Sequence, residues 1–447
     1  MMSHRNAGRG ALAVAIAITG ALIAPLGSGA SGVVLPALDE PGVADVGATR
    51  DTSVPDVVSV IQLSTLTPTV EQAVAHAAAV AGGVAVPGRS VMVGMSSLTR
   101  GSAVVQQPPA GYLIPMGLTV LPIDAAVRLM GAPVAGVLSA GQIVIGPTSA
   151  PLRGAAAGDG VHLQAAGGGS VDVSIGRVAA DDEIGGAELV MSPVTADLLG
   201  VTAITRMIVW GFRSRAAIDA AFAAEGFAEP NVRIFRSWDA PNPDSTIGLS
   251  QTKKLLGEFA YRVNGPDSLA LTPGWSDANI HPRVTFNDIA VRAGCNNVVH
   301  PAVQGALSEL AAAGLAGLID TVSTNSTGGC FVPRFNRVTG NLGFVSRHSW
   351  GQALDINVST NPLGAVPKLD CRVVRVFRKW GFAWGGNFLS RDGMHMEWIG
   401  ERRDQLVYPS VFCPNIAPAA AAQPASRTPA VRMSSIATMF AGDGLVD

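Results

Sequence analysis

Charged residues are scarce in this chain of 447 residues: Asp, Glu, Lys and Arg make up 14% of it, and the formal net charge is -2. No global electrostatic field would therefore attract the chain to nucleic acid, and nucleic-acid binding is not expected. Aromatic residues are also few, at 5%, but hydrophobic residues reach 48%, which is too many for a chain that is disordered throughout. The 52 glycines include no phosphate loop that ends in Lys-Ser or Lys-Thr, so nucleotide binding gains no support.

Long apolar runs are also lacking, except close to the N-terminus. Arg5 and Arg9 precede an apolar stretch over residues 11–26, and small residues follow up to Ala30. This order is typical of an export signal, so we expect residues 1–30 to be a signal peptide that is cleaved after Ala30. An uncleaved membrane anchor is the alternative. The protein is therefore expected to be secreted or to lie in the cell envelope, with membrane contact only if this segment is retained.

Cysteine is rare as well, and no two cysteines have the close C-x-x-C spacing of a zinc knuckle or a redox pair. In an exported chain, four cysteines predict two disulfides. The sequence by itself leaves all three pairings open. The four cysteines are Cys295, Cys330, Cys371 and Cys413.

The length allows two or three domains, and stretches rich in proline, glycine and small polar residues indicate where they are joined. We expect an accessory α+β domain, then a second domain, then a disordered tail rich in alanine and proline. The expected segments are a linker at 31–55, the accessory domain at 56–238, a linker at 239–250, the second domain at 251–413 and the tail at 414–447.

Local signals predict several helices and strands. Thr67 and Pro68 are a favourable N-cap and first residue for a helix that the glycines at 82–83 would end. Residues 161–164 and 171–178 alternate as strands do, with three glycines between them, which predicts a hairpin. Further predicted elements are a strand at 206–212 and helices at 215–225, 301–313 and 370–380.

Four histidines are expected to be structural rather than functional. Isolated histidines most often serve a structural role. His281 and His300 each precede a proline and have no acidic or histidine partner at the spacing of metal ligands. The four are His76, His162, His281 and His300.

Two short stretches combine histidines with carboxylates, at residues 346–357 and 392–398. Neutral imidazoles and a carboxylate are ligands that zinc prefers, and three protein ligands leave a fourth position for water. A zinc ion so bound lowers the pKa of water to roughly 7 and polarises a carbonyl group. Such a site also needs a general base near the water.

These stretches resemble a known family, the zinc D-alanyl-D-alanine carboxypeptidases of the VanY type and their L-alanyl-D-glutamate peptidase relatives, which cut the peptide stems of bacterial cell walls. The signature S-x-H-x-x-G-x-A-x-D is met in full, as is the closing pattern of an acid three residues before a histidine. The matching residues are Ser346, His348, Gly351, Ala353, Asp355, Asp392 and His395. The resemblance covers about residues 285–400. The acid is aspartate where many relatives have glutamate, which leaves the cleaved bond open.

The resemblance implies a role for each matched residue. It implies that His348, Asp355 and His395 bind zinc and that Asp392 is the general base. Arg334, in a segment similar to the family's arginine segment, would stabilise the substrate carbonyl or the developing oxyanion. Glu397 would lie on the same strand face as His395, and it is either an alternative base or an orienter of a ligand.

The resemblance also implies a fold and a disulfide pairing. The C-terminal domain is expected to have the Hedgehog/D,D-peptidase fold, preceded by the accessory α+β domain. Relatives pair cysteines at the positions of Cys295 and Cys330, which leaves Cys371 to join Cys413.

The function expected from this resemblance is that of an exported zinc metallopeptidase, a carboxypeptidase or endopeptidase that hydrolyses peptidoglycan stem peptides. The alternative is a non-catalytic or regulatory cell-wall binding protein that retains the metal site. Asp392 and Arg334 argue against this alternative, because binding alone requires neither a base nor an oxyanion donor.

Overall fold

A computed structural model of the chain describes residues 56–227, 232–266, 268–286, 289, 292–320 and 329–415. The predicted signal peptide, the linker at 31–55 and the expected tail, apart from its first two residues at 414–415, lie outside the described residues. All described residues belong to one compact unit, Leu35–Asp447. No helix within them is long and apolar enough to cross a membrane. The division into domains at 239–250 stays a prediction.

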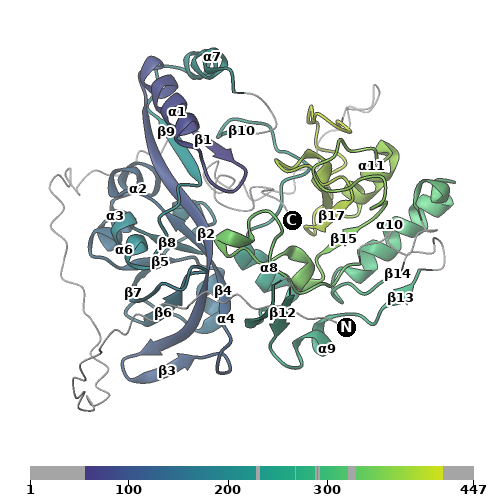
Figure 1. Cartoon of the computed structure of the whole chain (residues 1–447), viewed down its shortest axis with the longest axis horizontal. Coiled ribbons are helices and arrows are strands. Elements are labelled where there is room, and N and C mark those ends of the chain that lie inside the picture. The colour runs from purple at the N-terminus through teal and green to yellow at the C-terminus, as the bar shows by residue number, and fades with distance from the viewer. Residues whose placement is uncertain are drawn as a thin grey trace, which may run out of the picture. The chain divides into compact units, whose positions relative to one another are not determined.

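The chain is a mixed α+β protein, as predicted, and its first part is built on a ten-stranded sheet (Figure 1). Along the sheet the strand order is β10-β1-β9-β2-β4-β8-β5-β7-β6, and β3 pairs with β2. Because β6 also pairs with β2, the six strands from β2 to β6 in this order close into a ring. The strands are β1 (Val57–Gln62), β2 (Val84–Arg100), β3 (Ala103–Gln106), β4 (Ile114–Val120), β5 (Ile143–Ile145), β6 (Gly160–Gln164), β7 (Ser170–Val178), β8 (Leu189–Met191), β9 (Arg206–Trp210) and β10 (Val232–Arg236).

Helices cover the sheet, and successive strand residues face different cores, because side chains alternate between the two faces of a strand. In β8, Leu189 and Met191 join a core to which all six ring strands contribute, whereas Val190 packs with α2 and α3. Helices α1 and α7 pack on the part of the sheet that contains β1 and β9. The helices of this region are α1 (Pro68–Val80), α2 (Ile123–Met130), α3 (Ala132–Ser139), α4 (Ser149–Arg153), α5 (Asp181–Ile184), α6 (Pro193–Leu198) and α7 (Arg215–Glu225).

The C-terminal part combines short sheets with helices around a separate hydrophobic core. Its central sheet has the antiparallel order β15-β17-β16, and α10 and α11 pack together beside it (Figure 1). The strands are β11 (Tyr261–Gly265), β12 (Ser268–Leu271), β13 (Val284–Thr285), β14 (Arg292–Ala293), β15 (Ala353–Asp355), β16 (Phe382–Trp384) and β17 (His395–Trp398). The helices are α8 (Leu249–Leu256), α9 (Trp275–Asn279), α10 (His300–Ala312) and α11 (Cys371–Lys379), with 3-10 helices η1 (Ala316–Leu318), η2 (Gly340–Leu342), η3 (Arg347–Trp350) and η4 (Gly385–Asn387).

The elements predicted from local signals are confirmed, with ends that differ by a few residues at most. Thr67 caps α1 by accepting a hydrogen bond from the backbone N–H of Val70, and Pro68 is the first helical residue. Strands β6 and β7 form the predicted antiparallel hairpin. The predicted helices at 215–225, 301–313 and 370–380 correspond to α7, α10 and α11, and the predicted strand at 206–212 corresponds to β9.

Strand β2 also contacts the segment that precedes the first predicted metal ligand. Met92 belongs to the core of the C-terminal part, and its sulfur accepts a hydrogen bond of 3.4 Å from the backbone N–H of Val345. Gly343 has a φ of 82°, and a Cβ atom at this position would lie only 2.2 Å from the carbonyl oxygen of Met92. Glycine is therefore required where this segment approaches β2.

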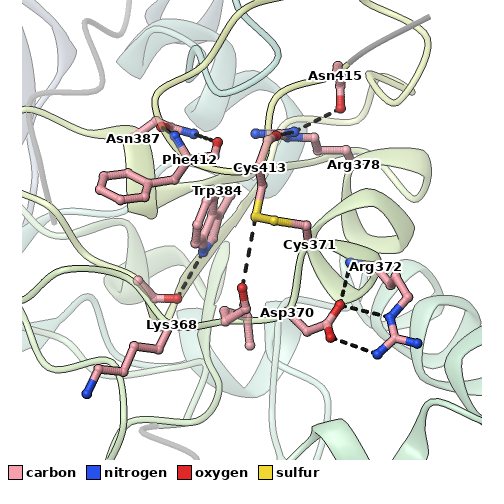
Figure 2. Close-up of a disulfide and its surroundings, with 12 residues drawn as sticks. Lys368, Asp370, Cys371, Arg372, Arg378, Trp384, Asn387, Phe412, Cys413 and Asn415 are labelled. Carbon is pink, nitrogen blue, oxygen red and sulfur yellow. Dashed lines mark hydrogen bonds and ion pairs between the residues drawn. A yellow bond between two sulfur atoms is a disulfide. The ribbon is translucent and has the colours of Figure 1, made fainter.

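Two disulfides are present, and the pairing implied by the family resemblance is confirmed: Cys295 joins Cys330, and Cys371 joins Cys413. Figure 2 shows the second disulfide beside α11, whose N-cap residue Asp370 accepts a hydrogen bond from the backbone N–H of Arg372. Nearby, the buried Arg378 donates hydrogen bonds to the carbonyl oxygen of Cys413 (2.7 Å) and to the side chain of Asn415 (2.8 Å). The disulfide and Arg378 together fasten the last described residues to α11.

A buried group of charges joins α8 to the ring of strands. The ammonium group of Lys253 donates hydrogen bonds to Glu188 and to the carbonyl oxygen of Pro115, and it lies 3.2 Å from Glu258. Arg153 forms ion pairs with the same two glutamates. Burial by itself raises the pKa of Glu188, but Lys253 and Arg153 lower it more, so that the pKa lies below its ordinary value. These partners keep Glu188 ionised inside the protein.

We expect Lys253→Met to lower the free energy of unfolding by about 3 kcal/mol, because it removes one partner of a buried carboxylate. The matched control is Lys254→Met, which changes the next residue of α8, an exposed one, and should alter stability by less than about 0.5 kcal/mol. Urea unfolding followed by circular dichroism measures both changes. Equal stability of the two variants would contradict a stabilising role for the buried charges.

Candidate metal centre

Three residues from separate elements converge in the C-terminal part: His348 of η3, Asp355 of β15 and His395 of β17. Each offers one ligand atom, and these atoms all lie within 4.8 Å of one another. Oδ1 of Asp355 is 3.3 Å from Nε2 of His348 and 3.4 Å from Nδ1 of His395. Both imidazoles are buried, and Asp355 is half-buried. The structure thus brings together the three residues that the motifs predict as ligands.

Backbone geometry explains why these side chains meet. In the antiparallel pairing of β15 with β17, Asp355 is directly opposite His395. His348 lies on a turn that Ser346 caps, and the turn ends at Gly351, whose φ is 62°. A Cβ atom at Gly351 would lie 2.6 Å from the backbone nitrogen of Asn296, so only glycine allows the chain to turn from η3 into β15 at this point.

Each imidazole has its second nitrogen close to another acceptor. Nδ1 of His348 lies 3.1 Å from the carbonyl oxygen of Cys330, a residue held by its disulfide to Cys295. Nε2 of His395 lies 3.6 Å from Oε2 of Glu397. A proton on each of these nitrogens leaves Nε2 of His348 and Nδ1 of His395 as lone-pair donors on the side of Asp355.

The charge of Asp355 also suits a cation. Burial by itself raises the pKa of Asp355, but without a metal the positive charge of His348 and His395 and the hydrogen bonds that they donate to Asp355 lower it more, and the pKa lies well below its ordinary value. The carboxylate is therefore ionised at neutral pH. Two imidazole nitrogens and one carboxylate oxygen form a donor set that fits zinc. This chemistry is the reason for regarding the three residues as a candidate metal centre.

Asp392 is buried in the turn that leads into β17. Its backbone carbonyl accepts a hydrogen bond of 3.1 Å from the N–H of His395, and its own N–H donates to the carbonyl oxygen of Gly385 (2.9 Å). Asp392 is not one of the three residues whose ligand atoms cluster within 4.8 Å. Its position next to a ligand but outside the ligand set is compatible with the role of a base.

Arg334 lies beside the turn that carries His348. Its backbone N–H donates a hydrogen bond of 3.0 Å to the hydroxyl of Ser349, and its carbonyl oxygen accepts hydrogen bonds from Ser349 (3.1 Å) and from the N–H of Ser346 (3.0 Å). The guanidinium group donates to the carbonyl oxygen of Phe335. Arg334 is thus fixed to both ends of the turn through its backbone.

Glu397 lies on the central strand β17, between Ala353 and Ala383 of the neighbouring strands. Its two oxygens approach different residues, because Oε2 is near His395 and Oε1 lies 3.5 Å from Nε of Arg347. The sequence leaves the role of Glu397 open between a base and an orienter of a ligand, and it indicates no role for Arg347. The signal that could have indicated Arg347 is weak: a basic residue next to a predicted ligand.

Four other histidines of the described residues lie outside this group, and each has a partner in space. His76 pairs with Glu225 at 2.6 Å, and His162 pairs with Asp172 at 2.7 Å. His281 and His300, which have no partner at ligand spacing along the chain, contact each other in space, and their rings stack with centroids 3.7 Å apart. Tertiary packing brings the members of these pairs together, and the spacing of the residues along the chain does not reveal such contacts. None of the four histidines expected to be structural belongs to a candidate metal group of three or more residues in the described part of the chain. They are His76, His162, His281 and His300.

Comparison with known protein families supports this interpretation of the site. Residues 339–398 match the family model described as D-alanyl-D-alanine carboxypeptidase. The family resemblance seen in the motifs is therefore confirmed over this segment, which contains all three ligand candidates as well as Asp392 and Glu397. Arg334 lies before it. No curated protein matches the chain.

We expect the purified protein to bind about one zinc ion per chain, because three protein ligands make a site with one open position. His395→Ala removes one of these ligands and should abolish tight binding. Elemental analysis after dialysis measures the metal content. His76→Ala, which changes a histidine outside the group, is the control, and unchanged zinc in the His395 variant would refute the assignment.

Proposed function

We propose that this protein is an exported zinc peptidase that hydrolyses the stem peptides of peptidoglycan, in the manner of a D-alanyl-D-alanine carboxypeptidase. The observation that carries the proposal is the convergence of His348, Asp355 and His395 inside the segment that matches this peptidase family. The family description names D-alanyl-D-alanine carboxypeptidase activity, and the assignment to peptidoglycan stem peptides is part of the proposal.

His348, Asp355 and His395 would hold the zinc ion. When bound, zinc supplies a Lewis acid for the scissile carbonyl and lowers the pKa of a water molecule. The carboxylate of Asp392 accepts the proton of the attacking water and returns it to the amine nitrogen that leaves. The guanidinium group of Arg334 donates hydrogen bonds to the substrate carbonyl oxygen as negative charge develops on it.

Export is supported by the two disulfides, because disulfides persist mainly in oxidising compartments outside the cytosol. The N-terminal segment, with its arginines and apolar run, agrees with this. The proposal places the protein in the cell envelope or the medium, with membrane attachment only if that segment is retained. It includes a Hedgehog/D,D-peptidase fold for residues 251–413 and an accessory α+β domain at 56–238.

Asp392→Asn separates an enzyme from a binding protein, because it keeps the shape of the side chain and removes its basicity. We expect this variant to retain zinc and to lose turnover by about 10²- to 10⁴-fold, the usual contribution of a general base. Glu397→Gln should reduce turnover less when zinc is saturating. Mass spectrometry of muropeptides after incubation with each protein measures the products.

Asp277→Asn, an exposed aspartate of α9, is the matched control and should cleave at the parent rate. If Asp392→Asn also cleaved at the parent rate, the assignment of the base would be wrong. If the parent protein bound zinc and cleaved no muropeptide, the function would be that of a cell-wall binding protein that retains the metal site.

A further inference from the structure

The contacts of His395 point to a residue that acts behind the metal centre. Nδ1 of this imidazole faces Asp355, and Nε2 faces Oε2 of Glu397 at 3.6 Å. Glu397 is buried, with 3% of its surface exposed. A buried carboxylate beside the outer nitrogen of a ligand histidine can hold both the proton and the ring orientation that metal binding needs.

A buried carboxylate needs a partner of its own, and Arg347 provides it. No hydrogen bond from a described residue reaches Oε1 of Glu397, so the contact of 3.5 Å with Nε of Arg347 offsets the cost of burying the charge. The two oxygens of Glu397 are thereby divided between Arg347 and His395. The position of Glu397 against the imidazole thus depends on Arg347.

Arg347 is itself anchored at its far end. One terminal nitrogen donates a hydrogen bond of 3.1 Å to the hydroxyl of Thr252 in α8, and the other donates to the carbonyl oxygen of Ile247 (2.8 Å). The hydroxyl of Thr252 in turn donates to the side chain of Gln352 at 3.1 Å. Each of the three guanidinium nitrogens therefore has a separate acceptor. The planar guanidinium fork suits this arrangement, and a lysine could not reproduce it.

We propose that Arg347 is a positioning residue for the metal centre: it holds Glu397 against Nε2 of His395, so that Nδ1 is presented to the metal. The inference rests on the proposed function, because it requires that His395 bind a metal. A direct role of Arg347 in substrate binding is disfavoured by its geometry, since its side chain is only 16% exposed and all its nitrogens are engaged.

The test measures zinc affinity by competition with a chelator, without reference to turnover. Arg347→Ala and Glu397→Gln should each weaken zinc binding by about 10- to 100-fold, the usual effect of changing a residue behind a ligand. The double variant should bind no more weakly than Glu397→Gln alone, because both changes break the same chain of contacts. Arg347→Lys, which keeps the charge but loses the fork, should regain only part of the affinity.

A spectroscopic measurement separates positioning from a general loss of stability. The cobalt(II)-substituted parent and Arg347→Ala proteins should differ in their visible absorption bands, which report the ligand geometry. Arg402→Ala removes an exposed arginine that pairs with Asp404, and it should leave both the affinity and the spectrum unchanged. Thermal unfolding of each metal-free variant identifies any that fail to fold. If Arg347→Ala fails to fold, the zinc affinities of Glu397→Gln and Arg347→Lys test the positioning role instead.

Parent-like zinc affinity and an unchanged cobalt spectrum in Arg347→Ala would overturn the inference. So would a variant that differs from the parent only in a raised KM, because Arg347 would then contact substrate. If the parent itself bound no zinc, the proposed function would fail first and the inference with it. If the parent and the Arg347→Ala variant bound zinc equally well, the inference about Arg347 would be wrong, but the proposed function would stand.

Discussion

The antiparallel pairing of β15 with β17 is the constraint on which the candidate metal centre depends. It sets Asp355 opposite His395, so that two ligand candidates far apart in sequence are held in register by backbone hydrogen bonds. Sites on paired strands keep a more precise geometry than sites on loops. His348 joins them because Gly351 turns the chain from η3 directly into β15. A shift of one residue in this pairing would move one ligand to the other face of the sheet.

Buried charges organise a protein whose overall content of charged residues is low. Asp355 contacts two imidazoles, and Arg378 forms a buried ion pair with Asp244 in the segment before α8. Lys253 and Glu188 form another such pair. A buried charge that loses its partner costs several kcal/mol, whereas the pair itself adds little net stability. The value of these pairs is therefore that they penalise arrangements of the chain in which the partners separate.

How far the sequence predicted the structure depends on whether the signal was local. The start of α1 was predictable because Thr67 and Pro68 act on the next turn of the chain. The three ligand candidates were predictable because residue type and motif spacing carry the chemistry. The anchoring of Arg347 was not, since its partners Thr252 and Glu397 lie far from it along the chain. For the same reason, the closing of the ring of strands and the stacked histidines could not be predicted.

Two consecutive residues of helix α8, Thr252 and Lys253, contact the C-terminal part and the ring of strands respectively. Successive positions of a helix point about 100° apart, so a helix packed between two bodies can serve both. Thr252 accepts a hydrogen bond from Arg347, on the side of the metal centre, and Lys253 enters the buried charges around Glu188. Because both contacts belong to one rigid turn, a displacement of Lys253 would also displace the anchor of Arg347. If Arg347 positions Glu397 as proposed, the orientation of His395 depends on the packing of α8 against the ring of strands.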